Sequence, residues 1–175
     1  MMDESERERR FAAWTTAHAA ILHRVVNGFA QGADRDDLMQ EILLATWKAI
    51  PAFREGSLPS TFLYRVTHNA ALTWKRGERS RRERLERFER LSDRNPGAAA
   101  AAEGESVSEQ ERQLRRLYEA IRELSAVDRS LVLLSLDGLP YAELAAIHGL
   151  TASNVGARLT RARQAVALRL QGEPT

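Results

Sequence analysis

Apolar residues recur three and four positions apart along most of this chain, and this spacing restricts its fold more than any other feature of the sequence. Trp14, Ile21 and Val25 belong to one such series, and Val155 and Leu159 to another. This spacing places apolar side chains on one face of an α-helix. The sequence lacks the regular alternation that marks half-buried strands, and its β-branched residues are scattered. The sequence therefore predicts an all-α protein.

Helix breakers and capping residues divide this pattern into two groups of helices. The first group is expected to contain a helix that starts near residue 11 and ends between residues 28 and 32, a helix over 34–50, and a helix from about 60 past 75. The second group is expected to start near residue 111 and to continue with helices over about 125–138, 141–148 and 151–170. Asp34 and Thr151 are capping residues, Pro51 cannot continue a helix, and Gly138 and Gly149 suit helix ends.

Almost no side chain between the two groups can be buried. Residues 92–110 contain Asn-Pro-Gly, an alanine run and an acidic stretch with serines. An isolated helix as short as the alanine run is only marginally stable in water. We therefore expect two small helical domains, over residues 1–90 and 113–171, joined by a flexible linker over 91–112.

Composition narrows the setting of the protein. A chain of 175 residues that is 43% hydrophobic can bury one ordinary core or two small ones. It has no cysteine, which excludes disulfides and cysteine-ligated zinc. Its N-terminus is densely charged where a signal peptide needs an apolar core, and no apolar run approaches the roughly 20 residues of a membrane span. These features predict a cytoplasmic protein with no membrane insertion.

The segment from Tyr141 to Arg163 has the layout of a helix-turn-helix. Leu144 would pack the first helix, Gly149 would allow the tight turn, and Val155 and Leu159 would press the second helix against the first. A second helix held this way can enter the major groove of DNA. The competing interpretation is a purely structural helix hairpin.

The charge of the last helix favours the DNA-binding interpretation. Between Thr151 and Leu170 there are four arginines and no acidic residue, so a cationic face exists although the whole chain carries a formal net charge of only +2. Its outward row combines this charge with small polar side chains. The row contains Ser153, Asn154, Gly156, Ala157, Thr160, Arg161 and Gln164.

A second basic segment follows the aromatic and amide residues Tyr64, Asn69 and Trp74. Residues 75–90 contain eight basic and four acidic side chains, which leaves a charge of +4. Cations beside aromatic rings suit single-stranded or melting DNA, where phosphates need neutralising and unstacked bases need platforms. The same interleaved charges also suit a solvated helix stabilised by ion pairs.

Three motifs, in order, resemble those of the extracytoplasmic-function (group IV) sigma factors, the smallest sigma factors, which have only regions 2 and 4. Residues 37–41, Asp-Leu-Met-Gln-Glu, followed by 47–50 and 53–54, resemble the region 2 helix that binds core RNA polymerase. Residues 61–70 resemble the segment that captures the minus-ten promoter element. Residues 124–163 resemble region 4, whose recognition helix reads the minus-thirty-five element.

The resemblance implies that domain 1–90 is a region 2 helical bundle and domain 113–171 a region 4 helix-turn-helix. The implied partners are bacterial core RNA polymerase, promoter DNA and an anti-sigma factor. The expected polymerase-binding residues are Asp37, Gln40, Glu41 and Lys48. The expected minus-ten contacts are Arg54, Ser57, Ser60, Thr61, Tyr64, Arg65, His68, Asn69, Lys75 and Arg76. The expected minus-thirty-five contacts are Ser153, Asn154, Gly156, Ala157, Arg158, Thr160, Arg161 and Arg163.

The chain departs from the family pattern at positions where the family touches DNA. Gly156 and Ala157 stand where a basic residue and a serine are common, so a phosphate or base contact is lost. Phe62 stands where tryptophan is usual. Pro59 stands where an apolar or aromatic residue is usual, in the loop whose family counterparts hold a flipped base. The promoter sequence of the family therefore does not transfer to this chain.

Catalysis is not expected. The four histidines have no metal-ligand spacing, and no glycine-rich phosphate loop is present in the sequence, so no catalytic residue, metal or cofactor is predicted. The closer alternative is a helix-turn-helix regulator that binds duplex DNA without polymerase. Its C-terminal half would look much the same, so the N-terminal half, with Asp37, Gln40, Glu41 and Asn69, has to discriminate between the two.

Overall fold

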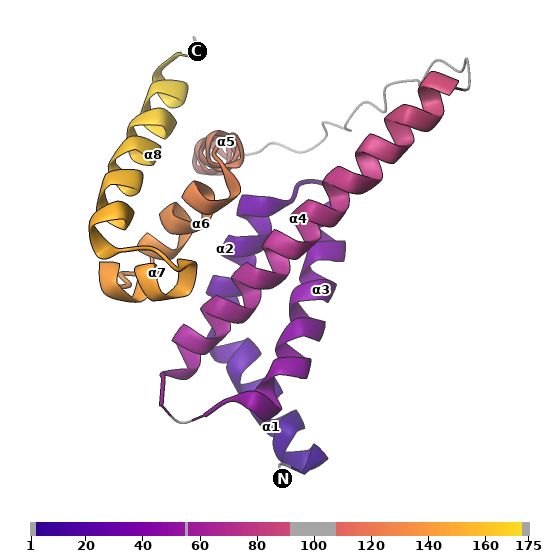
Figure 1. Cartoon of the computed structure of the whole chain (residues 1–175), viewed down its shortest axis with the longest axis vertical. Helices are drawn as coiled ribbons and strands as arrows, with labels where there is room; N and C mark the ends of the chain where they lie inside the picture. The colour runs from indigo at the N-terminus through magenta and orange to yellow at the C-terminus, as the bar shows by residue number, and fades with distance from the viewer. Residues whose placement is uncertain (1–2, 55, 92–107, 173–175) are drawn as a thin grey trace.

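The computed structural model describes residues 3–54, 56–91 and 108–172, and these residues form helices and loops without a strand (Figure 1). The all-α prediction is confirmed. The elements are α1 (Glu4–Ala17), α2 (Ala19–Phe29), α3 (Asp34–Ala49), the 3-10 turn η1 (Ile50–Ala52), α4 (Pro59–Leu91), α5 (Glu109–Arg122), α6 (Ala126–Ser135), α7 (Tyr141–His148) and α8 (Ala152–Gly172).

The single N-terminal helix expected from the sequence is two helices. The chain leaves helical geometry at His18, whose φ is −118° and ψ is 24°. The separate direction of α1 lets Arg7 lie over the ring of Trp47, 4.1 Å from its centre, and donate hydrogen bonds to the Trp47 carbonyl at 2.7 and 3.0 Å. The break contains neither glycine nor proline. Contacts of α1 with α3 stabilise it instead.

Helix α5 also starts earlier than expected, inside the proposed linker. Ser108 and Glu111 form a capping box, in which Ser108 Oγ accepts from Glu111 N at 3.2 Å and Glu111 Oε2 accepts from Ser108 N at 2.9 Å. This reciprocal pair satisfies donors that would otherwise be free at the first turn. Residues 109–112 are therefore helical, and residues 92–107 of the expected linker lie outside the described residues.

The helix-turn-helix is built as the sequence predicts. Gly149 has a φ of +66°, a left-handed conformation that favours glycine, and Leu150 N donates to Ala145 O at 2.9 Å across the turn. Thr151 Oγ1 accepts from Asn154 N at 3.2 Å and caps α8. Val155 and Leu159, both completely buried, hold α8 against α6 and α7.

The two groups of helices share one continuous core rather than two separate ones. Helix α2 contacts α5 and α6, and α4 contacts α6, so the C-terminal helices lie along the N-terminal bundle (Figure 1). Gly28 of α2 lies close to α6, because a Cβ there would lie 2.4 Å from Leu133 Cδ1. Buried residues on both sides, including Phe29 and Leu133, belong to one cluster. The sequence patterns gave no sign of this contact between the halves.

Candidate nucleic-acid interface

Helix α8 presents most of the predicted minus-thirty-five residues on one open face. Its buried side is formed by Val155, Leu159, Ala162 and Val166. The opposite side is exposed and carries Ser153, Asn154, Ala157, Thr160, Arg161 and Arg163. The arginines on this side have no carboxylate contact among the described residues, so their charge is available to phosphates or base edges.

Two predicted residues of this helix lie close to other parts of the protein. Arg158 is half-buried, and its Nε donates to Asp128 Oδ1 at 2.8 Å, in an ion pair with the first turn of α6. Gly156 packs near Tyr141, since a Cβ at 156 would lie 3.4 Å from the Tyr141 ring. That distance is an ordinary van der Waals contact, so a Cβ fits at position 156 and the structure gives no packing reason for glycine there.

The expected polymerase-binding residues share one exposed surface. Asp37, Gln40, Glu41 and Lys48 are all exposed on α3, whereas Leu38 and Ile42 of the same helix are completely buried. The fold therefore depends on the buried face, and the polar face has no structural task among the described contacts. Glu41 and Asn69 also line one groove of about 560 Å³ between α3 and α4, which brings a predicted polymerase contact beside a predicted DNA contact.

The structure separates the predicted minus-ten residues into two sets. One set is open to solvent and consists of Arg54, Ser57, Arg65, Asn69 and Arg76. The other set is wholly or partly covered and consists of Ser60, Thr61, Tyr64, His68 and Lys75. Tyr64 and His68 are only 5% and 2% exposed, and burial raises the pKa of Tyr64 to about 12. Neither side chain can reach DNA in this arrangement.

Helices of the C-terminal half provide part of that cover. Thr61 Oγ1 donates to Glu143 Oε2 of α7 at 3.2 Å, and His68 Nδ1 of α4 lies 2.6 Å from Ser130 Oγ of α6. Arg24 of α2 forms an ion pair with Asp137, which follows α6. Arg122 of α5 donates to the Asn27 carbonyl at 2.9 Å. These polar contacts join residues far apart in the chain, which local spacing does not reveal.

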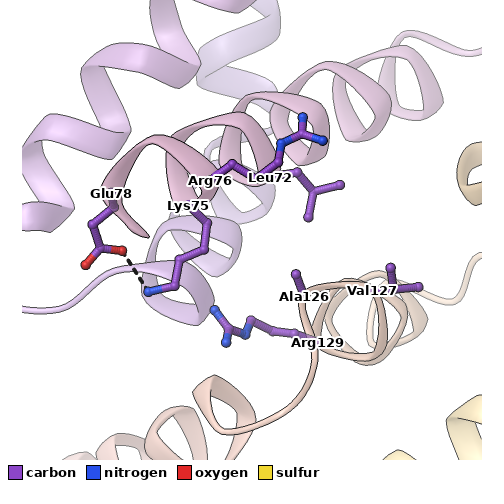
Figure 2. A pocket seen from close by; sticks show the side chains of 7 residues that line it. All are labelled: Leu72, Lys75, Arg76, Glu78, Ala126, Val127 and Arg129. Atoms are coloured by element: carbon purple, nitrogen blue, oxygen red, sulfur yellow. Dashed lines mark hydrogen bonds and ion pairs between the residues drawn. The ribbon is translucent and has the colours of Figure 1, made fainter. Parts of the chain in front are cut away.

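Lys75 and Arg76 line a pocket of about 530 Å³ between α4 and α6 (Figure 2). Lys75 Nζ forms an ion pair with Glu78 at 2.7 Å, and Arg129 of α6 contributes a third cation. Arg129 is itself buried, donates to the carbonyls of Arg122 and Leu124, and lies over the Phe29 ring. The basic start of the arginine-rich segment thus faces the second half of the chain.

The loop before α4 rests on an aromatic cluster. The ring centres of Trp14, Phe53 and Phe62 lie 4.9 to 6.0 Å apart in edge-to-face pairs. Edge-to-face packing of this kind adds stability beyond the buried area. Phe62, which replaces the usual family tryptophan, therefore anchors the loop and leaves the neighbouring Arg54 and Ser57 exposed.

Other site types have little support in the described part of the chain. No group of three or more histidine, aspartate or glutamate side chains there has a geometry that could hold a metal ion. None of the described helices is both long enough and apolar enough to cross a bilayer.

Comparison with known proteins gives the same assignment in both halves. Residues 15–81 match the family described as Sigma-70 region 2, and residues 114–166 match Sigma-70, region 4, so the matches together cover more than half of the chain. The ECF RNA polymerase sigma-E factor of Escherichia coli (strain K12) is 29% identical over 153 residues, 84% of this chain and 79% of that protein. The ECF RNA polymerase sigma factor SigM of Mycobacterium tuberculosis (strain ATCC 35801 / TMC 107 / Erdman) is 28% identical over 151 residues, 86% of this chain and 71% of that protein.

Solved structures agree on the fold. The sigma factor RpoE in complex with the anti-sigma factor NepR from Bartonella quintana superposes with a TM-score of 0.62 at 21% identity, over 95% of this chain and 98% of that one. CnrH in complex with the cytosolic domain of CnrY gives the same score and identity, over 95% of this chain and 91% of that one.

The match to region 2 removes support from the regulator alternative, because that alternative explains only the C-terminal half. The family matches, the relatives and the fold agree along the chain. The chain therefore belongs to the extracytoplasmic-function sigma factors, which bind core RNA polymerase and direct promoter-specific initiation of transcription.

Proposed function

We propose that three surfaces of this chain divide the work of a sigma factor. The exposed face of α3, with Asp37, Gln40, Glu41 and Lys48, binds core polymerase. Helix α4 and the loop before it bind the minus-ten element, and the exposed face of α8 reads the minus-thirty-five element. The observation that carries this proposal is the cationic face of α8, which is open to solvent on a well-formed helix-turn-helix.

We also propose that these surfaces belong to functional units close to residues 1–90 and 113–171. The capping box at Ser108 extends the second unit to include all of α5. Promoter binding requires the units to separate at least partly, since Tyr64 and His68 are covered by the second unit in the structure. We call the arrangement in the structure, with the two units packed together, the closed arrangement. In it, the expected minus-ten contacts that are open to solvent are Arg54, Ser57, Arg65, Asn69 and Arg76.

An anti-sigma factor is proposed as a third partner. One protein of similar fold, the sigma factor RpoE, is known in complex with the anti-sigma factor NepR, and another, CnrH, is known in complex with the cytosolic domain of CnrY. We further propose that the chain acts in the cytoplasm as a non-catalytic subunit. The activity of the assembled enzyme would then come from core polymerase.

The division of labour on α8 predicts two kinds of DNA-binding defect. Arg161 lies on the exposed face one turn beyond Ala157, where a side chain can reach a base edge. We expect Arg161→Ala to cost about 1 to 3 kcal/mol on the cognate element and to remove discrimination at one base position. Binding titrations across single-base variants of the element measure both effects.

Arg163→Ala is the matched comparison for this prediction. Arg163 is exposed on the same helix, and its guanidinium lies 3.2 Å from Ser135 Oγ, toward the side of the recognition face. If Arg163 contacts a phosphate, its removal should weaken binding to all sequences alike. It should also lower the slope of log affinity against log salt concentration by about one unit. The assignment of Arg161 to base readout is wrong if Arg161→Ala leaves the base preference intact.

A further inference from the structure

Two histidines and a serine meet where the halves of the protein pack together. His68 comes from α4, Ser130 from α6 and His148 from α7. Ser130 Oγ lies 2.6 Å from His68 Nδ1 and 3.2 Å from His148 Nε2, and the imidazole ring centres are 4.5 Å apart. One hydroxyl thus bridges an imidazole of the N-terminal unit and an imidazole of the C-terminal unit.

The bridge requires that at least one of the two imidazoles is uncharged. A serine hydroxyl has one proton to donate, so it can donate to one imidazole nitrogen while it accepts from the other only if at least one ring keeps a free lone pair. His68 Nε2 is buried without a hydrogen-bond partner. A proton added there would create a buried charge with no acceptor, which is strongly unfavourable.

The charged groups around the bridge do not favour protonation. Arg158 of α8 faces His148. His68 packs edge-to-face against the Phe29 ring of α2, and Arg129 of α6 lies over that same ring. The carboxylate of Asp128 is engaged by Arg158. Within the described residues neither imidazole has a carboxylate partner. Three nearby acids are engaged with other residues: Asp137 with Arg24, Glu143 with Thr61, and Glu78 with Lys75.

Burial and these neighbours act in the same direction on both rings. Burial, and secondarily the nearby His148, lowers the pKa of His68 from its ordinary value of 6.5 to about 3. Burial, and secondarily Arg158, also lowers the pKa of His148. In the closed arrangement both imidazoles therefore stay neutral at pH values where an exposed histidine would be charged.

We propose that the bridge formed by His68, Ser130 and His148 is an acid-sensitive latch, which holds the two halves together near neutral pH and releases them when the imidazoles gain protons. Release would uncover His68 and the neighbouring face of α4. This opening depends only on residues of this chain and needs no partner protein. The consequence for transcription rests on the proposed function, but the opening itself does not.

The sign follows from proton linkage. A base whose pKa is lowered in the closed form stabilises that form above its open-state pKa and loses this contribution as the pH falls. With an open-state pKa of 6.5 and a closed-state pKa of about 3 for His68, lowering the pH from about 7.5 to about 5.5 raises the ratio of open to closed chains about 10-fold through this histidine. The lowered pKa of His148 acts in the same direction and adds to this effect.

Energy transfer within the full-length chain can test the latch. The sequence has no cysteine, so Ala13→Cys on α1 and Ala167→Cys on α8 would place a donor and an acceptor dye on exposed positions of the two halves. We expect transfer to fall between pH 7.5 and pH 5.5 at constant ionic strength, while the helical circular dichroism is retained. The expected midpoint lies below 6.5.

Substitutions identify the groups that titrate. His68→Gln with His148→Gln keeps polar side chains that cannot protonate in this range and leaves Asp137 and Glu143 in place, and it should abolish the pH dependence. His148→Gln alone should reduce it. His23→Gln, at an exposed position of α2, is the matched control and should leave it unchanged. The proposal is overturned by constant transfer in the dye-labelled chain that keeps both histidines, by a loss of transfer that accompanies loss of helix, or by a pH response that persists in the variant lacking both histidines. Each of these outcomes concerns the latch and leaves the sigma-factor assignment untouched.

Discussion

Gly28→Leu should separate the two halves of the chain while each half stays folded. A Cβ at position 28 would lie 2.4 Å from Leu133 Cδ1, and both residues are buried where α2 meets α6. A leucine side chain at position 28 has to displace Leu133, which is itself almost completely buried, so we expect it to push the two helices apart; overpacking of this kind costs about 1 to 3 kcal/mol. Inside α2 itself, replacement of glycine favours the helix. Only the contact between the halves should suffer.

The expected consequences are a larger radius of gyration in solution scattering and tighter binding of single-stranded minus-ten DNA. If closure hides part of the DNA-binding face, the apparent affinity rises by the factor by which the open form becomes more populated, about 5- to 150-fold for the cost given above. Gly77→Leu is the control for scattering, because a Cβ at position 77 meets nothing within 4 Å. An unchanged radius for the folded Gly28→Leu variant would mean that the two halves do not pack this way in solution.

Gln40→Ala combined with Glu41→Lys should abolish co-purification with core polymerase. Both side chains are exposed on α3, and the fold of this helix depends instead on the buried Leu38 and Ile42. Loss of a hydrogen-bonding amide and reversal of a charge at the centre of an interface together remove contacts and introduce repulsion. Circular dichroism should show unchanged helix content.

Glu8→Lys provides the control for this loss of binding. It makes the same charge reversal at an exposed position of a different helix, α1, and should leave polymerase binding intact. Equal loss with both variants would point to a general effect of charge. Retained binding by the α3 variant would place the polymerase interface elsewhere on the chain.

The sequence predicts those parts of the fold that depend on local chemistry. The turn at Gly149 needs a left-handed residue, Thr151 is a suitable cap, and the apolar spacing from Val155 onwards specifies the buried face of α8. All three features can be read within about 20 residues of the chain. The exposed faces of α3 and α8 follow from the same helical phase.

Features that depend on distant partners escape such reasoning. The break at His18 is stabilised by Arg7 against Trp47, 40 residues away. His68 and Ser130 lie 62 residues apart, and Arg158 and Asp128 lie 30 apart. The family resemblance therefore assigned His68 and Arg158 to DNA, and the structure shows both in contact with other parts of the protein. The start of α5 was missed for a different reason. Ser108 and Glu111 have the local spacing of a capping box, but they lie in an acidic stretch with the composition of a linker.

Run-off transcription with purified bacterial core polymerase tests the central claim most directly. The purified chain, core enzyme and a library of genomic promoter fragments are combined, and transcripts are mapped with and without the chain. As a sigma factor, the chain should produce transcripts from discrete start sites that core enzyme alone does not make, and the variant with Gln40→Ala and Glu41→Lys should fail to produce them. No transcription above core enzyme alone, from folded protein that still binds duplex DNA, would contradict the account and favour a regulator that acts without being a polymerase subunit.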